Sequence, residues 1–405
     1  MASSKTKTVA LFGLFGQGNF GNDGSLEAEL NALRAVSPQT AFVCICTGPE
    51  EIAQAFQIAT LPIHWPLPES KLFQLVDRLF LKIPRRLVRF ALSVKHLRRI
   101  DAIIVPGTGI LDDFGDGPLA MPLTLLSWCA AAKLAGTRFA FVSIGAGPIN
   151  NSKSRLLMKW AAQLADYRSY RDKGAMDFMT GLRIDTSRDR LFPDVAFQLA
   201  NVKTPDAPPL PDGALTVAVG VMTYCGWECD PEAGADIYRD YLNKITRFIV
   251  WLLDRGHRVR VVIGDNGDRP AVRDVLGEVE KARPEIAEAR VSFKDAHSLH
   301  DITAQLAETD VVVATRFHNI VCALKLCLPA ISISYAEKND MLMADMGLGA
   351  FCQHIEQLDV DRLIEQFTAL SAQRGLYEAG LREANSRYKD ELRAQNELLI
   401  TRYMS

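Results

Sequence analysis

Short apolar runs rich in β-branched residues alternate along the chain with longer amphipathic stretches. The runs are apolar throughout, which indicates strands that are covered on both faces. Such an alternation predicts a mostly parallel sheet with helices packed on it. In the first half of the sequence the predicted strands cover residues 9–12, 42–46, 102–106, 139–144 and 167–170.

The alternation stops at a proline-rich stretch, residues 201–213, and then resumes. Four prolines within thirteen residues break both helices and sheets, so this stretch predicts a linker. The strands predicted after it cover 216–221, 259–263, 291–293, 311–315 and 330–334, and a helix covers about 236–255. We therefore expect an α/β protein of two Rossmann-like, doubly wound domains facing a cleft, as in GT-B glycosyltransferases.

Length agrees with two domains, because 405 residues exceed the ~250–300 at which a single core stops growing. The expected limits are an N-terminal domain over 1–200, the linker over 201–213, a C-terminal domain over 214–360 and a helical segment over 361–405. Within the last segment one long, charged helix is predicted over about 361–404.

Charge and cysteine content narrow the function classes. Forty-six basic residues against forty-eight acidic ones leave a net charge of -2, which argues against a nucleic-acid binder held by global electrostatics. The eight cysteines include no Cys-x-x-Cys pair and lie mostly in apolar runs, as expected of buried thiols in a reducing compartment. No uncharged apolar run reaches ~18 residues, so no membrane span is predicted and the expected location is the cytoplasm.

Ligands of open α/β sheets bind beyond the carboxyl ends of the strands, so the residues that follow each run are the candidates. Gly16, Gly18 and Gly21 follow the first strand and fit a G-x-G-x-x-G pattern. The second strand lacks the acidic residue that would hold a ribose, which disfavours a dinucleotide site. The loop predicts either a nest of backbone amides for an anion or sugar hydroxyls, or only a tight turn. Its candidate ligand-binding residues are Gly18, Asn19, Gly21, Asn22 and Asp23.

Three further strand ends carry candidates. Gly107-Thr108-Gly109 follows the third strand and Gly145 the fourth, where small residues let a ligand approach the main chain or simply allow a turn. Arg171 follows the fifth strand and could clamp a carboxylate or phosphate, or be a solvated surface group. Asp194 could lie in the same crevice or cap a helix.

The sharpest constellation is Arg316-Phe317-His318, directly after a buried strand. A permanent cation beside a group that exchanges protons near neutral pH suits an anionic substrate whose reaction needs proton transfer. The alternative is a hydrogen-bonded core histidine with a salt-bridged arginine. Tyr335 and Lys338 follow the next strand. His297 and His300 are three residues apart, but no third ligand accompanies them, so no metal site is predicted.

In this order the motifs make the chain similar to the polysaccharide pyruvyl transferase family over nearly its whole length. The opening loop departs from the family pattern at Asp23-Gly24-Ser25, and residues 61–100 match nothing in it. Both departures concern the choice of acceptor. The matching stretches are 18–24, 106–109, 143–145, 170–172, 193–194 and Arg316-Phe317-His318, followed by Pro329, Tyr335, Lys338 and 346–349.

The resemblance implies an enzyme that moves the pyruvyl group of phosphoenolpyruvate onto two hydroxyls of a sugar, in a polysaccharide or its precursor, and releases phosphate. It implies no cofactor beyond this co-substrate. Arg171 and Arg316 would hold the donor's carboxylate and phosphate, with Lys338 and Tyr335 beside them, and His318 would be the acid and base. Residues 1–200 would form the acceptor side and 214–360 the donor side.

Two other functions stay open on the sequence alone. A GT-B glycosyltransferase that uses a nucleotide sugar would have the same architecture. An inactive sugar-binding assembly protein could have kept the fold without the chemistry.

A basic segment, residues 71–99, lies between the strands predicted over 42–46 and 102–106. It holds nine basic residues and a single acid, Asp77, with apolar residues between them and an interruption at Pro84. The pattern is typical of an amphipathic helix that either lies on an anionic membrane surface or covers the core with a solvated face. The first alternative predicts peripheral contact with the inner face of a membrane, and a lipid-linked saccharide acceptor would fit it.

Overall fold

The structure is a computed structural model, and it describes residues 6–67, 69–114, 116–200, 202, 213–226 and 231–404. By its internal contacts the chain forms two compact units. The first unit comprises Met1–Gln17, Ser25–Val195 and Leu392–Ser405, and the second comprises Gly18–Gly24 and Ala196–Glu391. Of the predicted linker, only residues 202 and 213 lie among the described residues.

The first unit is built around a seven-stranded parallel sheet. Its strands are β1 (Thr8–Gly13), β2 (Ala41–Cys46), β3 (Ala59–Pro62), β4 (Ala102–Pro106), β5 (Arg138–Ile144), β6 (Tyr167–Tyr170) and β7 (Arg190–Leu191). The helices between them are α1 (Phe20–Val36), α2 (Pro49–Phe56), α3 (Lys71–Leu79), α4 (Ile83–Leu97), α5 (Met121–Ala135), α6 (Ser152–Leu164) and α7 (Lys173–Gly181). The strand order is β3-β2-β1-β4-β5-β6-β7, which reverses at β1 as in Rossmann-like sheets.

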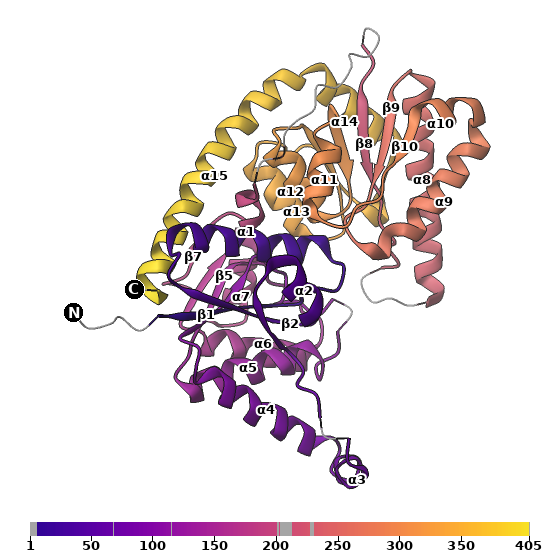
Figure 1. Cartoon of the computed structure of the whole chain (residues 1–405). Helices are drawn as coiled ribbons and strands as arrows, with labels where there is room; N and C mark the ends of the chain where they lie inside the picture. Colours follow the sequence, from indigo (N-terminus) through magenta and orange to yellow (C-terminus); the bar gives the residue numbers. More distant parts are fainter. Residues whose placement is uncertain are drawn as a thin grey trace. The chain divides into compact units, whose positions relative to one another are not determined.

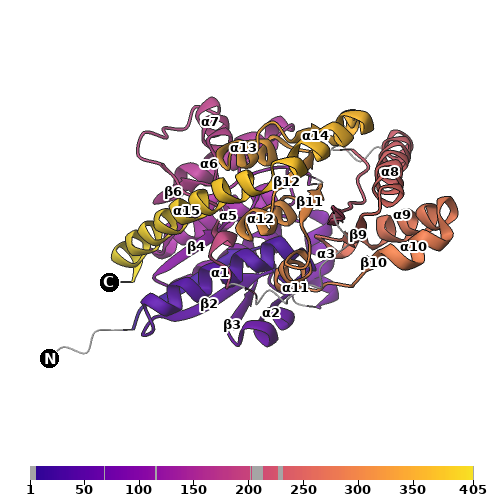
Figure 2. The same cartoon turned by 90° about the horizontal axis from the view of Figure 1, so that it is seen from above.

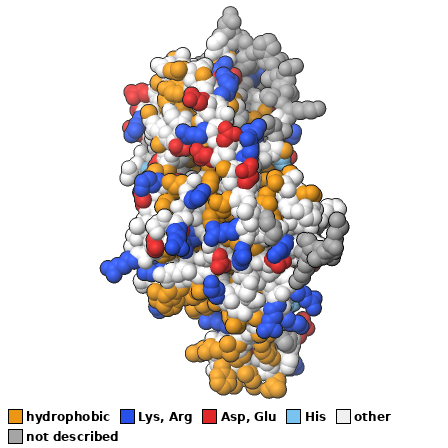
Figure 3. Space-filling model, turned by 90° about the vertical axis from the view of Figure 1, so that its left-hand side faces the viewer, with side chains coloured by type: hydrophobic (Ala, Val, Ile, Leu, Met, Phe, Trp, Pro, Cys, Tyr) orange, Lys and Arg blue, Asp and Glu red, His pale blue; other side chains and the backbone are white. Residues whose placement is uncertain are grey.

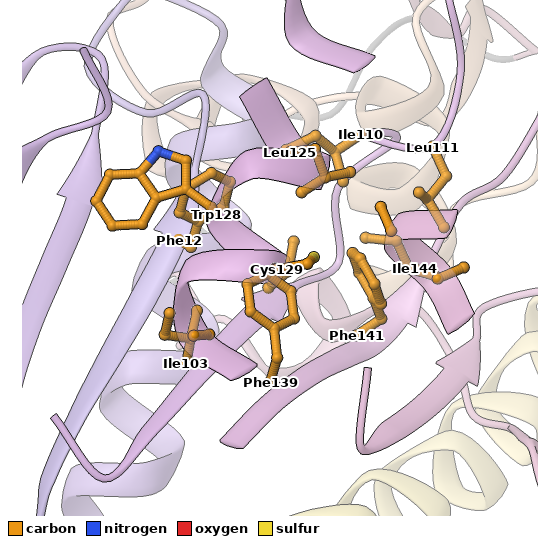
Figure 4. Close-up of a cluster of buried hydrophobic side chains, with 14 of the residues drawn as sticks. Phe12, Ile103, Ile110, Leu111, Leu125, Trp128, Cys129, Phe139, Phe141 and Ile144 are labelled. Atoms are coloured by element: carbon orange, nitrogen blue, oxygen red, sulfur yellow. The ribbon is translucent and has the colours of Figure 1, made fainter. Parts of the chain in front are cut away.

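Both faces of this sheet are covered, and the alternation of side chains along each strand assigns them. Ala10 and Phe12 of β1 belong to the core beneath α4 to α7, whereas Val9 and Leu11 belong to the core beneath α1 and α2. In Figure 4 side chains of α5 gather against those of β1, β4 and β5. The Trp128 ring lies 5.7 Å from the Phe12 ring. This explains why the runs that predict β1 and β4 are apolar throughout.

The second unit repeats the arrangement with six parallel strands in the order β10-β9-β8-β11-β12-β13. In Figures 1 and 2, α8, α9 and α10 lie side by side next to its β9–β10 edge. The strands are β8 (Thr216–Gly220), β9 (Arg258–Val262), β10 (Val291–Phe293), β11 (Val311–Ala314), β12 (Ala330–Ser334) and β13 (Cys352–His354). The helices are α8 (Pro231–Asp254), α9 (Arg269–Ala282), α10 (Pro284–Arg290), α11 (Leu299–Leu306), α12 (Phe317–Lys325), α13 (Glu337–Asp345) and α14 (Val360–Ala372).

Short 3-10 turns complete the chain: η1 (Val195–Gln198), η2 (Asn266–Asp268) and η3 (Ile355–Gln357). The last helix is α15 (Arg374–Tyr403), which begins in the second unit and ends in the first. Its first part is held by Arg374, which pairs with Asp310 at 2.6 Å, and its last part by Gln395, which donates to Ser169 at 2.9 Å.

Two expectations from the sequence need correction. The single helix predicted over 361–404 is two helices, because the chain leaves helical geometry at Gln373 between α14 and α15. Helix α1 begins at Phe20, so Gly21, Asn22 and Asp23 form its first turn and not a loop. By its contacts this turn is grouped with the second unit, and the domain limits expected from the sequence stay a prediction.

Candidate functional site

Strand β11 delivers the central residues of the site. Its four residues are fully buried, and Thr315 after them is buried too, with its hydroxyl 3.1 Å from that of Tyr241. Arg316 then caps α12 with an extended backbone at φ -71° and ψ 133°. The chain therefore turns from strand to helix at Arg316, and its side chain leaves at the carboxyl edge of the sheet.

Arg316 forms a bidentate ion pair inside the second unit. Its Nε donates to Oδ2 of Asp268 at 2.9 Å and its Nη2 to Oδ1 at 2.7 Å. Burial alone would lower the pKa of Arg316, but the Asp268 carboxylate more than offsets this and raises it. Asp268 takes up two of the five guanidinium N–H groups. The geometry thus matches the salt-bridged alternative for Arg316 and leaves three N–H groups outside this pair.

His318, the second residue of α12, is half-buried and lies against the first turn of α1. A Cβ placed on Gly21 would lie 2.0 Å from Nδ1 of His318, so only glycine fits there. The same turn is tied to η2, because Asn19 forms an antiparallel bridge with Asp265 and the Asn266 amide donates to the Gly18 carbonyl at 3.2 Å. The glycine-rich turn is therefore shaped around His318.

Asn19 also caps α1. Its Oδ1 accepts from the Asn22 amide at 3.1 Å, and its carbonyl accepts from the Asp23 amide at 3.2 Å. The predicted residues Gly18, Asn19, Gly21, Asn22 and Asp23 thus lie in one turn of backbone beside His318.

Lys338 and Tyr335 lie at the end of the neighbouring strand, β12. The Nζ atom of Lys338 is 5.1 Å from the centre of the Tyr335 ring and 5.9 Å from that of Phe317. The Phe317 ring in turn meets the His318 ring edge-on at 5.2 Å. Since β11 and β12 are adjacent, the ends of the two strands bring a cation, two aromatic rings and an imidazole together.

In the first unit Arg171 is buried beneath two predicted loops. Its Nη1 donates to Asp194 at 2.8 Å and to the Gly107 carbonyl at 3.2 Å, and its side chain is 4% exposed. A Cβ on Gly145 would lie 2.5 Å from its Nη2. Arg171 therefore supports the loops after β4 and β5, and its guanidinium is not an open surface group.

The remaining candidates are Gly107, whose carbonyl accepts from Arg171, and Thr108 and Gly109, which follow it in the chain. The Gly107 backbone is left-handed at φ 55°, and a Cβ there would meet Val195 at 2.4 Å. The Thr108 carbonyl accepts from the Gly145 amide at 3.0 Å, which joins the two loops. The predicted site residues thus form one group in each unit, and their convergence on one substrate stays a prediction.

Sequence reasoning missed Asp268, although the signal was available. The residues that follow β9, from Gly264 to Asp268, are polar and glycine-rich like those of the other strand ends. Reading them by the same rule would have found the partner of Arg316. Across the part of the chain that the structure describes, no group of three or more His, Cys, Asp or Glu side chains is placed to hold a metal ion.

Two parallel sheets with interleaved helices, each reversing its strand order at its first strand, define an α/β protein of the GT-B-like class. The model of the polysaccharide pyruvyl transferase family matches residues 19–337, so the chain belongs to that family. A search of curated protein sequences gave no match.

Solved structures share the fold at low sequence identity. S. aureus MnaA, in a co-structure with UDP, matches with a TM-score of 0.62 and 12% identity over 98% of this chain and 96% of that chain. A glycosyltransferase from Rickettsia africae ESF-5 matches with a TM-score of 0.62 and 10% identity, over 99% of this chain and 98% of that chain. UDP-GlcNAc 2-epimerase from Neisseria meningitidis, bound to UDP-GlcNAc, matches with a TM-score of 0.57 and 12% identity, over 96% of this chain and 99% of that chain. At these identities the likeness shows the fold alone.

Proposed function

We propose that the chain transfers the pyruvyl group of phosphoenolpyruvate to two hydroxyls of a saccharide, as a cyclic ketal, and releases phosphate. The family match supports a transfer of this kind. The observation that carries the assignment is the group formed by His318, Lys338 and Arg316 at the carboxyl ends of β11 and β12. No cofactor is needed, because phosphoenolpyruvate brings both the carbon skeleton and the leaving group.

The reaction balances without an oxidant. A proton adds to the methylene carbon of phosphoenolpyruvate, and one hydroxyl oxygen bonds to the carbon beside it. The carbon–oxygen bond to phosphate then breaks, and the second hydroxyl closes the ring. Of the two protons that the hydroxyls lose, one ends in the new methyl group and the other leaves with phosphate.

His318 is the acid and base of this scheme. An imidazole at the start of a helix can hold or release a proton near neutral pH, and its position is fixed by Gly21 on one side and Phe317 on the other. It would protonate the methylene carbon and take up a hydroxyl proton.

Lys338 and Arg316 would balance the negative charge of the donor. The Lys338 ammonium lies near two aromatic rings, and its charge suits the departing phosphate. Arg316 would contribute N–H groups that Asp268 does not use, while Asp268 holds the guanidinium in place. Arg171 would act on the loops it supports and not on the donor.

The test is phosphate release from phosphoenolpyruvate with a panel of nucleotide-linked, lipid-linked and simple glycosides, with the ketal identified by mass spectrometry. We expect His318→Ala to lower kcat by ~10²–10⁴-fold, the range of a general acid or base. His297→Ala is the control, because its side chain is 74% exposed and belongs to no part of the group. Release of phosphate by a folded His318→Ala protein at the wild-type rate would remove the assignment.

A GT-B glycosyltransferase is the competing function, since two of the similar structures are described with UDP or UDP-GlcNAc bound. It predicts nucleotide release on turnover and a higher unfolding temperature with a nucleoside diphosphate. The pyruvyl transfer predicts neither. A sugar-binding assembly protein would bind saccharide and turn over no donor.

A further inference from the structure

Helix α3 and the start of α4 expose large apolar side chains that belong to neither core of the first unit. Seven of the sixteen strongly exposed large hydrophobic residues in the described part of the chain lie within this short stretch. No residue of α3 belongs to either core of the first unit, so α3 does not cover the sheet with a solvated face. The seven are Leu72, Leu75, Leu79, Phe80, Leu81, Ile83 and Leu87.

Three of these leucines form one stripe along α3. Leu72, Leu75 and Leu79 are spaced for a single helix face, and they are 71%, 57% and 68% exposed. Figure 1 shows α3 beyond the end of α4 that is farthest from β1 and β2, and Figure 3 shows hydrophobic side chains gathered in the same part of the molecule. The apolar surface is therefore continuous and open.

The turn between the helices presents a further leucine under strain. Leu81 and Lys82 both have left-handed backbones, at φ 51° and 64°, which is unfavourable for residues other than glycine. The backbone of the turn is held from within the chain, because the Leu81 amide donates to the Arg78 carbonyl at 3.3 Å and the Lys82 amide donates to the Asp77 carbonyl at 2.7 Å, while the Leu81 side chain is left 80% exposed. Asp77 fixes the turn, because its carboxylate accepts from the Arg85 amide at 2.9 Å and from Arg85 Nε at 2.5 Å.

Asp77, which pairs with Arg85, is the only acidic residue of the basic segment 71–99. None of the other eight basic side chains forms an ion pair with a described residue. Three of the arginines, Arg85, Arg86 and Arg89, also line a hollow of about 470 Å³ between α4 and α5, together with His64 and apolar residues. Cations beside an open apolar surface fit lipid headgroups that carry phosphate.

We propose that the hairpin of α3 and α4 docks on the surface of a bilayer that contains anionic phospholipids. The leucines and Phe80 enter the boundary between headgroups and acyl chains, while Lys82, Arg86 and their neighbours contact phosphates. A second copy of this chain is a poor occupant, because a two-fold contact would set the unpaired cations of one copy against those of the other. Among the described helices none has the length and apolar character to span a bilayer, so the contact lies in the interface.

This docking goes beyond the proposed catalysis, and its test uses no substrate. The full chain is sedimented with vesicles of phosphatidylcholine alone or mixed with phosphatidylglycerol. We expect binding to the mixed vesicles at low salt, at least tenfold weaker binding to the neutral ones, and loss of binding as salt rises. Absence of binding to the mixed vesicles at low salt overturns the proposal.

Matched variants separate the apolar and the charged contribution. Leu79→Glu should weaken vesicle binding at least tenfold, whereas Leu134→Glu, near the end of α5 and 67% exposed, should leave it unchanged. Lys82→Gln with Arg86→Gln should weaken it by roughly 10–30-fold on anionic vesicles, with Lys389→Gln as the neutral control. Equal losses in variant and control overturn the assignment to this hairpin.

A protein–protein role has a distinct signature. If Leu79→Glu converts a dimer into a monomer in analytical ultracentrifugation and the wild type ignores anionic vesicles, the surface belongs to a self-contact and the bilayer is excluded.

Discussion

Gly21 has room for a hydrogen atom and nothing larger, because the His318 imidazole occupies the place of its side chain. Gly18 is confined in the same way by Asn266, and it also has a left-handed backbone at φ 81°. The glycine-rich turn that the sequence offers as an anion or sugar site thus packs closely against His318 and Asn266, and its role in binding stays a prediction. Because glycine has no Cβ, the first turn of α1 and the start of α12 can approach each other closely.

Gly21→Ala therefore tests whether the turn sets the position of His318. We expect the free energy of unfolding to fall by ~1–3 kcal/mol, as for an overpacked site, and phosphate release to fall with it. The control is Gly277→Ala, since Gly277 also lies within a helix but no atom would come within 4 Å of its Cβ. That variant should be more stable by up to ~1 kcal/mol. Urea unfolding measures both, and equal effects would mean that the turn does not rest on His318.

Strand ends are the elements that carry the site. Strand β11 ends at Arg316 and β12 leads to Tyr335 and Lys338, while η2 after β9 supplies Asp268. The Arg316–Asp268 pair joins η2 to α12, and Asp268 also accepts from the amides of Thr223 at 3.2 Å and Gly264 at 3.3 Å. One carboxylate therefore ties together the ends of β8, β9 and β11.

Asp268→Asn should cost about 3–5 kcal/mol of unfolding free energy, because it leaves a largely buried guanidinium without its counter-charge. Asp295→Asn is the matched control, since Asp295 pairs with Arg269 where both side chains are 31–46% exposed, and such pairs contribute less than ~1 kcal/mol. The measurement is the urea midpoint of each variant. Similar small losses for the two would show that Asp268 does not hold Arg316 in solution.

At the scale of the whole molecule, we expect the stability of the fold to depend on pH, because burial lowers the pKa of three histidines. Burial, and then nearby Arg255, lower the pKa of His257 below its ordinary 6.5. Its Nδ1 accepts from the Leu215 amide at 3.1 Å, which requires the neutral ring. Burial lowers the pKa of His64 and of His96 in the same direction.

A histidine whose pKa is lower in the folded state than in the unfolded state favours the fold while its ring is neutral. Its contribution to stability is complete above pH 6.5 and is lost as the pH falls through the folded-state pKa. We therefore expect the urea midpoint to decrease from pH 7 to pH 5.5. In His257→Asn, whose Oδ1 can accept from Leu215 but does not titrate, the decrease should be smaller. An unchanged or steeper decrease in this variant would exclude His257 as a source of the pH dependence.

Most of the strands could be predicted from the sequence. β4 and β12 are buried at every residue, and a strand that is buried on both faces needs an uninterrupted apolar run. Those predicted over 102–106, 167–170, 291–293 and 330–334 match β4, β6, β10 and β12 residue for residue. Strands β3, β7 and β13 were not predicted, since edge strands need no such run. The break at Gln373 was missed because helical periodicity continues on both sides of it.

The sequence by itself determined the fold class, the family motifs and the residues at the carboxyl ends of the strands, because these depend on local apolar patterns and on positions relative to a strand. Tertiary structure alone decided what each candidate faces. Arg171 pairs with Asp194, which is 23 residues away along the chain, and Arg316 pairs with Asp268, which is 48 residues away. His318 packs against Gly21, which is much farther away in the sequence. Pairing over such separations depends on how the sheets and helices pack, which no local pattern encodes.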